Sequence, residues 1–127
     1  MRNVTVAAIQ MSIPETPEKS VEKAEKLVRK AAAEGANVIL LPELFENWYF
    51  CQERRYDSYK LALPLEENPA VRRFQTVAKE LSVALPISFY EQDGNVLYNS
   101  VAMIDADGSV MGVYRKTHIP DDHFYQE

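Results

Sequence analysis

The hydrophobic positions along the chain change their period several times, and each period predicts a different element. Residues 4–10 are largely apolar and β-branched, which favours a buried strand. From Pro17 onward apolar side chains recur at helical spacing, with Thr16 as the candidate N-cap and Gly35 as the stop. An unbroken apolar run follows over residues 38–41. Strand, amphipathic helix and apolar strand together predict a βαβ unit with a parallel strand pair.

The second half of the chain predicts one more helix and then antiparallel strands. Asn68 and the proline after it open a helical pattern. Its expected inward face consists of five apolar side chains, Val71, Phe74, Val77, Ala78 and Leu81. Residues 83–90 form a predicted strand, in which Pro86 indicates an edge position or a bulge. Two glycine-containing turns then lead into predicted strands at 96–104 and 110–115, which completes an antiparallel meander.

The segment between these two parts, residues 45–66, carries aromatic and charged side chains without a clear period. It predicts a long loop with short helical pieces. The only cysteine, Cys51, lies in this segment beside Trp48, Tyr49 and Phe50. No helix start or neighbouring base is present to lower the pKa of the thiol, so a buried or wall-lining thiol is expected. The three aromatic residues either line a pocket or belong to the core.

Length and composition favour one small domain over residues 1–127. The chain is 46% hydrophobic, which suffices for one core. Its formal charge of -5 argues against a nucleic-acid partner, and no apolar run approaches the roughly 20 residues of a membrane helix. One cysteine excludes an internal disulfide and, with only two histidines, argues against a metal site. We therefore expect a reduced, cytoplasmic setting.

Two charged residues stand at the ends of predicted strands and are the candidates for chemistry. Glu43 follows Pro42 at the carboxyl end of the apolar run, where open α/β sheets place their functional crevice. Lys116 ends the last strand. A carboxylate and an ammonium brought together there could act as general base and oxyanion partner in attack on an amide-like carbon. The alternatives are a loop acid that caps a helix and a solvated lysine.

The sequences around both residues resemble a known family. Residues 41–45 (Leu-Pro-Glu-Leu-Phe) and 114–120 (Tyr-Arg-Lys-Thr-His-Ile-Pro) resemble the glutamate and lysine motifs of the nitrilase superfamily, the carbon–nitrogen hydrolases. Residues 98–100 and 104–108 extend the similarity, which runs in order from about Val4 to Glu127. The resemblance implies an α/β fold that is the N-terminal half of an αββα nitrilase-type sandwich. It also implies hydrolysis of non-peptide C–N bonds without a metal or organic cofactor.

The resemblance also assigns roles to individual residues. Glu43 would be the general base, Lys116 would hold the developing oxyanion, and Glu127 would be a supporting second glutamate. The expected substrate of the complete enzyme is a small ureido or amide compound. Five residues are candidates for its binding: Glu46, Asp121 and Asp122 as partners for a cationic end, with Trp48 and Tyr49 at the pocket wall.

The family's nucleophilic cysteine has no counterpart in residues 1–127. The resemblance places it on a later strand-to-helix turn, downstream of the second glutamate, and Cys51 matches a position outside the catalytic set. Residues 1–127 are therefore expected to form a partial carbon–nitrogen hydrolase domain that is inactive alone. Such a half-sandwich would expose apolar sheet surface, so we expect a homo-oligomer. The alternative is a non-catalytic module that binds a partner or itself.

Overall fold

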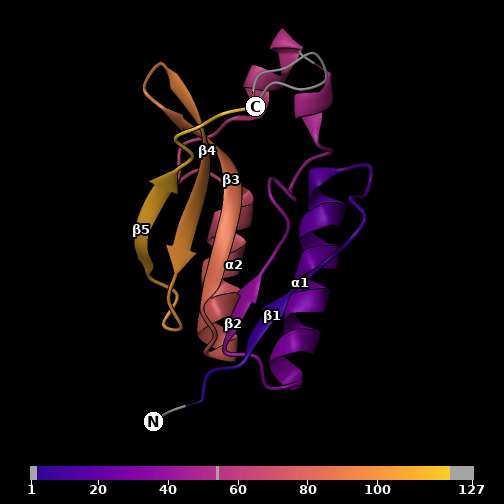
Figure 1. Cartoon of the computed structure of the whole chain (residues 1–127), viewed down its shortest axis with the longest axis vertical. Helices are drawn as coiled ribbons and strands as arrows, with labels where there is room; N and C mark the ends of the chain where they lie inside the picture. Colours follow the sequence, from indigo (N-terminus) through magenta and orange to yellow (C-terminus); the bar gives the residue numbers. More distant parts are fainter. Residues whose placement is uncertain (1–2, 54, 121–127) are drawn as a thin grey trace.

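The computed structural model describes residues 3–53 and 55–120 and has an α/β architecture (Figure 1). Strands β3, β4 and β5 lie side by side with α2 behind them, and α1 lies beside the shorter strands β1 and β2. The elements in chain order are β1 (Val6–Ala8), α1 (Pro17–Ala33), β2 (Val38–Leu40), η1 (Phe50–Gln52), η2 (Tyr56–Leu61), α2 (Pro69–Leu81), β3 (Leu85–Asp93), β4 (Val96–Ile104) and β5 (Val110–Arg115). This order confirms the predicted βαβ start, the second helix and the closing meander.

The βαβ unit forms where the local signals place it. Strands β1 and β2 pair in parallel, with Ala7 opposite Ile39. The hydroxyl oxygen of Thr16 accepts a hydrogen bond from the Lys19 amide at 3.3 Å, which satisfies one of the first-turn donors of α1. Gly35 follows the helix with a φ of +96°, a conformation that glycine adopts without a Cβ clash.

Pro86 explains why the pairing between β2 and the segment that leads into β3 is limited to a single bridge. Strands β3, β4 and β5 form an antiparallel sheet with β3 at its edge, and β2 contacts this edge through a single parallel bridge between Val38 and Ala84. The Ala84 amide donates to the Asn37 carbonyl at 2.9 Å. The next donor in this register would be the amide of residue 86, and proline has none. The pairing therefore stops there, which confirms the predicted edge position.

Both helices bury their apolar stripes on the same face of the strands. The largest side chains of this core come from the two helices, the strands and the turn after β2: Phe45, Phe74, Phe89, Ile39, Leu85, Ile87, Ile104, Val28, Val71 and Val77. The rings of Phe45 and Phe74 meet edge to face, with their centroids 5.7 Å apart. Within residues 3–53 and 55–120, no helix combines the length and the apolar character needed to traverse a bilayer.

On the face of the strands that lies opposite the helices, several apolar side chains are exposed to solvent. Side chains alternate along a strand, so the neighbours of the buried Ile39 and the partly buried Ala7 point away from the helices. Val6 is 73% exposed and Leu40 is 50% exposed on that face. Tyr114, on the corresponding face of β5, is 63% exposed. The chain thus leaves an apolar sheet surface in contact with solvent.

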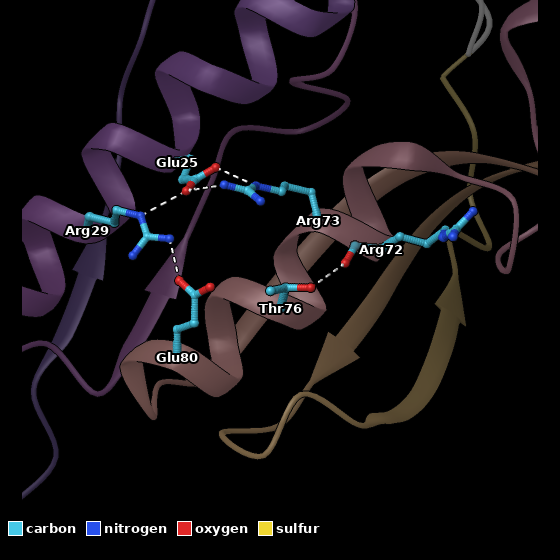
Figure 2. Close-up of polar contacts among 6 residues, drawn as sticks. All are labelled: Glu25, Arg29, Arg72, Arg73, Thr76 and Glu80. Carbon is cyan, nitrogen blue, oxygen red and sulfur yellow. Dashed lines mark hydrogen bonds and ion pairs between the residues drawn. The ribbon is translucent and has the colours of Figure 1, made fainter.

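The two helices are also joined by charged side chains (Figure 2). The Glu25 carboxylate on α1 accepts hydrogen bonds from Arg73 Nε at 2.6 Å and Arg73 Nη2 at 2.8 Å, and from Arg29 Nε at 2.8 Å. Arg29 in turn donates to Glu80 on α2. The hydrogen bond from Arg73 is the main cause that lowers the pKa of Glu25.

Candidate active site

The turn that follows β2 holds Glu43 in a constrained backbone. The next residue, Leu44, has a φ of +49°, in the left-handed region that a bulky side chain rarely adopts. Its amide donates to the buried Ser88 hydroxyl of β3 at 2.9 Å. From the helix side, the buried Ser20 hydroxyl donates to the Phe45 carbonyl at 2.5 Å. Two buried serines, one from each side, therefore hold the turn in a conformation that costs on the order of 1 kcal/mol.

The structure brings Glu43 and Lys116 together across 73 residues of sequence. Lys116 Nζ donates to Glu43 Oε1 at 3.0 Å, and Asn99 Nδ2 donates to the same oxygen at 2.8 Å. The Lys116 amide donates to the Asn99 carbonyl at 2.8 Å, which fixes the lysine relative to β4. The Glu43 and Lys116 side chains are 46% and 30% exposed, so this ion pair contributes at most about 1 kcal/mol to stability. The pair is therefore accessible from solvent and contributes little to holding the fold.

An ion-pair cluster on the helix-facing side anchors the end of β5 just before Lys116. Arg115 donates through Nη2 to Glu91 Oε1 at 2.7 Å and through Nε to Glu91 Oε2 at 3.0 Å, and it also binds Asp93 at 2.6 Å. Its guanidinium lies 4.0 Å from the ring centroid of Tyr98. These bonds lower the pKa of the buried Glu91, with Arg115 as the main cause. Since successive residues point to opposite faces, a fixed Arg115 directs Lys116 toward Glu43.

A small cavity lies beside the lysine. Its volume is about 230 Å³, and its lining residues are Tyr59, Tyr90, Leu97, Tyr98, Asn99, Lys116 and Ile119. Burial raises the pKa of Tyr90, whose ring lies 4.9 Å from that of Phe50. A phenol with a raised pKa remains a hydrogen-bond donor at neutral pH. The cavity is therefore lined by phenol, amide and ammonium groups, of which the amide and the ammonium also bond to Glu43.

The residues predicted to bind substrate lie in several places. Glu46 is buried and accepts a hydrogen bond from Asn68 Nδ2 at 3.0 Å, at the start of α2. Burial raises the pKa of this carboxyl. Glu46 lines a separate cavity of about 410 Å³ between the two helices, not the cavity beside Lys116. Trp48 is 63% exposed and Tyr49 is half-buried, and neither lines the cavity beside Lys116.

Three predicted residues, Asp121, Asp122 and Glu127, fall outside the residues that the structure describes. Cys51 is 1% exposed within η1, which confirms the predicted buried thiol. In the described part of the chain, no three His, Cys, Asp or Glu side chains are grouped in a way that could hold a metal ion.

Asn99 is a residue of the site that the sequence analysis did not identify as a candidate. Its signals were its place in residues 98–100, which extend the family resemblance, and its polar side chain beside Ser100 in a largely apolar strand.

The chain is similar in sequence to carbon–nitrogen hydrolases. The model of that family matches residues 5–127. N-carbamoylputrescine amidase from Oryza sativa subsp. japonica is 51% identical over 124 residues, which cover 98% of this chain and 41% of that enzyme. Citrullinase from Francisella tularensis subsp. tularensis is 46% identical over 127 residues, which cover 100% of this chain and 44% of that enzyme. The chain therefore spans less than half the length of these curated relatives.

A solved structure gives the same result for the fold. The carbon–nitrogen hydrolase from Helicobacter pylori G27 superposes with a TM-score of 0.85 and 28% sequence identity. The superposition covers 93% of this chain and 41% of that chain. The likeness confirms the predicted fold class, an α/β portion of a nitrilase-type fold.

Proposed function

Because the chain belongs to the carbon–nitrogen hydrolase family, we propose that it supplies the base and the oxyanion-binding group of an amidase acting on a ureido substrate. The observation that carries the proposal is the 3.0 Å contact between Lys116 Nζ and Glu43 Oε1 at the edge of a donor-lined cavity. The identity of 51% to an N-carbamoylputrescine amidase supports N-carbamoylputrescine as the substrate. Citrulline, which the name of the second relative indicates, carries the same ureido group.

In the proposed reaction, Glu43 takes the proton of a cysteine thiol supplied from outside residues 1–127. The thiolate attacks the ureido carbon, and Lys116 stabilises the oxyanion of the tetrahedral intermediate. Collapse breaks a C–N bond, and Glu43 returns the proton to the departing ammonia. Glu43 then deprotonates a water that attacks the carbon of the S-thiocarbamate, and the departing thiolate takes that proton back from Glu43. The released carbamate loses carbon dioxide, so one ureido substrate and one water give putrescine, ammonia and carbon dioxide.

The remaining predicted residues keep their proposed roles around this pair. We assign Glu127 as the supporting glutamate that orients Lys116 and the substrate, and Asp121 and Asp122 as partners for the ammonium end of N-carbamoylputrescine. Their position shortly after Lys116 in the sequence supports this assignment. We also keep Glu46 as a proposed partner of the substrate. Its carboxylate accepts a hydrogen bond from Asn68 and lines the cavity between the two helices, so this role would require the substrate to extend beyond the cavity beside Lys116.

A chimera tests the proposal. Residues 1–127 replace the matching segment of the rice N-carbamoylputrescine amidase, and ammonia release is measured with N-carbamoylputrescine and with citrulline. The unchanged chimera should be active, and the 127-residue chain alone should release no ammonia. Glu43→Gln should lower kcat by about 10²–10⁴-fold and Lys116→Ala by about 10²–10³-fold.

Matched controls show whether those losses are specific. Glu67→Gln and Lys60→Ala change exposed residues of the same types and should leave kcat unchanged. Cys51→Ser should also leave kcat unchanged, because the thiol is buried and plays no nucleophilic part. Ammonia release by the isolated chain, abolished by Glu43→Ala, would overturn the proposal that the nucleophile lies elsewhere. If the chimera releases ammonia from citrulline but not from N-carbamoylputrescine, the proposed substrate is wrong and citrulline takes its place.

The open sheet face supports a second candidate function, a self-associating or partner-binding module without catalysis. Val6, Leu40 and Tyr114 present apolar side chains to solvent on that face. Burying such a surface would stabilise a homo-oligomer at about 25 cal/mol per Å² of apolar area. Sedimentation of the 127-residue chain at increasing concentration tests this function. A stable monomer throughout would exclude self-association.

A further inference from the structure

Asn99 is the residue through which both members of the candidate pair are held. It lies on β4 opposite Tyr90 of β3 and is 7% exposed. Its side-chain amide donates to Glu43 Oε1, and its backbone carbonyl accepts from the Lys116 amide, both at 2.8 Å. One residue therefore fixes the carboxylate through its side chain and the lysine backbone through its main chain.

The two oxygens of Glu43 are consequently not equivalent. Oε1 accepts hydrogen bonds from both Asn99 and Lys116, whereas Oε2 accepts none from the described residues. An oxygen that already accepts two hydrogen bonds holds a further proton less well than one whose lone pairs are vacant. The position of Oε1 is also fixed, because one donor comes from β4 and the other from the residue that follows β5.

We propose that Asn99 is a positioning residue that locks Glu43 Oε1 and thereby assigns Oε2 as the atom that accepts the proton. This inference rests on the proposed role of Glu43 as the base. An asparagine suits the task because it donates without carrying charge. An aspartate of the same size would place a second carboxylate against Glu43, and an alanine would leave the carboxylate free to turn so that Lys116 could occupy either oxygen.

The contact itself is tested in the 127-residue chain by NMR, without any need for activity. The Asn99 side-chain amide should give a resonance that shifts clearly in Glu43→Gln and stays in place in the control Glu67→Gln. Loss of the carboxylate removes a charged acceptor from that amide and should also speed its exchange with solvent. A resonance indifferent to Glu43→Gln would overturn the inference whether or not the proposed function holds.

The positioning role is tested in the chimera by a double-mutant cycle. Asn99→Ala should lower kcat by about 10–100-fold with KM changed less than about twofold, because the base is misdirected while the cavity remains. In a Glu43→Asp background, whose carboxylate no longer reaches the same position, Asn99→Ala should change kcat by less than about threefold. Asn99→Asp should be at least as impaired as Asn99→Ala.

The outcomes separate this inference from the proposed function. Equal losses from Asn99→Ala in both backgrounds would show that Asn99 acts independently of Glu43 and would overturn the inference. An inactive chimera with unchanged residues 1–127 would instead count against the proposed function, and the NMR result would still decide the contact. Thermal unfolding of each variant accompanies the kinetics, so that a loss of folded protein is not read as a loss of kcat.

Discussion

Replacing Glu25 by glutamine should weaken the charged contacts between the two helices and lower the stability of the chain, while it keeps the size of the side chain. The Glu25 side chain is 13% exposed between Arg73 and Arg29. Glutamine removes the charge and leaves a single oxygen as acceptor, so the bidentate contact with Arg73 is lost. Two guanidinium groups then face each other without the carboxylate between them, and their repulsion adds to the loss.

The magnitude follows from the exposure of the three side chains. An exposed ion pair contributes about 0.2–1 kcal/mol, and Glu25 forms one single and one bidentate contact. Its low exposure reduces screening, but Arg29 and Arg73 are 38% and 49% exposed, which limits the gain. We expect Glu25→Gln to lower the free energy of unfolding by about 1–2 kcal/mol, equivalent to a fall in Tm of about 4–8 °C for a chain of this size.

The pH dependence provides an independent check of the same argument. The pKa of Glu25 is lowered in the folded state, chiefly by Arg73. Its contribution to stability is therefore fully present above the ordinary glutamate pKa and is lost as the pH falls through the lowered value. The difference in stability between the unchanged chain and Glu25→Gln should be largest near neutrality and should narrow as the pH falls below the ordinary range of a glutamate.

The measurement is unfolding in urea and by heat, followed by far-UV circular dichroism at several pH values and salt concentrations. Glu22→Gln is the matched control, because Glu22 is an exposed glutamate one turn earlier on α1. If Glu25→Gln is no less stable than Glu22→Gln at neutral pH, or if its deficit does not shrink as the pH is lowered until the carboxyl groups are protonated, the reasoning is wrong.

Two further substitutions test the fold and the turn that carries Glu43. Gly108→Ala should lower the free energy of unfolding by about 2 kcal/mol or more, because φ is +86° and a Cβ would lie 2.6 Å from a backbone oxygen of α2. Gly112→Ala, where a Cβ meets nothing within 4 Å, is its control in the same thermal unfolding assay. Ser88→Ala should lower the free energy of unfolding by about 1–3 kcal/mol, because the buried amide of Leu44 loses its acceptor. Urea unfolding measures this change against Ser58→Ala, and equal stability of the two variants would contradict the role assigned to Ser88.

Local signals were sufficient for most of the secondary structure. The cap at Thr16, the stop at Gly35 and the opening of α2 at Asn68 each depend on a few adjacent residues, and the structure agrees with all three. The edge position of β3 followed from the missing amide of Pro86. Such features were predictable because the physical cause and its effect lie within one turn or one strand.

The site depended on information that no local pattern carries. The motifs identified Glu43 and Lys116 as candidates, but Lys116 Nζ comes within 3.0 Å of Glu43 Oε1 only because β5 pairs with β4 and the turn after β2 is held against β3 by Ser88. The pairing of β4 with β5 also places Asn99 beside Lys116, and nothing in the sequence around Asn99 indicates its contact with Glu43. The hydrogen bond from Asn68 to Glu46 likewise joins residues that are 22 positions apart in the sequence.

The sequence by itself determined the order of elements, the family and the two residues most suited to chemistry. Tertiary structure decided which side chains share an oxygen, which face each one occupies and which glutamate is buried. The physical reason is that periodicity and capping are fixed by neighbours along the chain. Hydrogen bonds between strands, and the serine contacts that hold the turn at Glu43, require a register that arises only when distant segments pack.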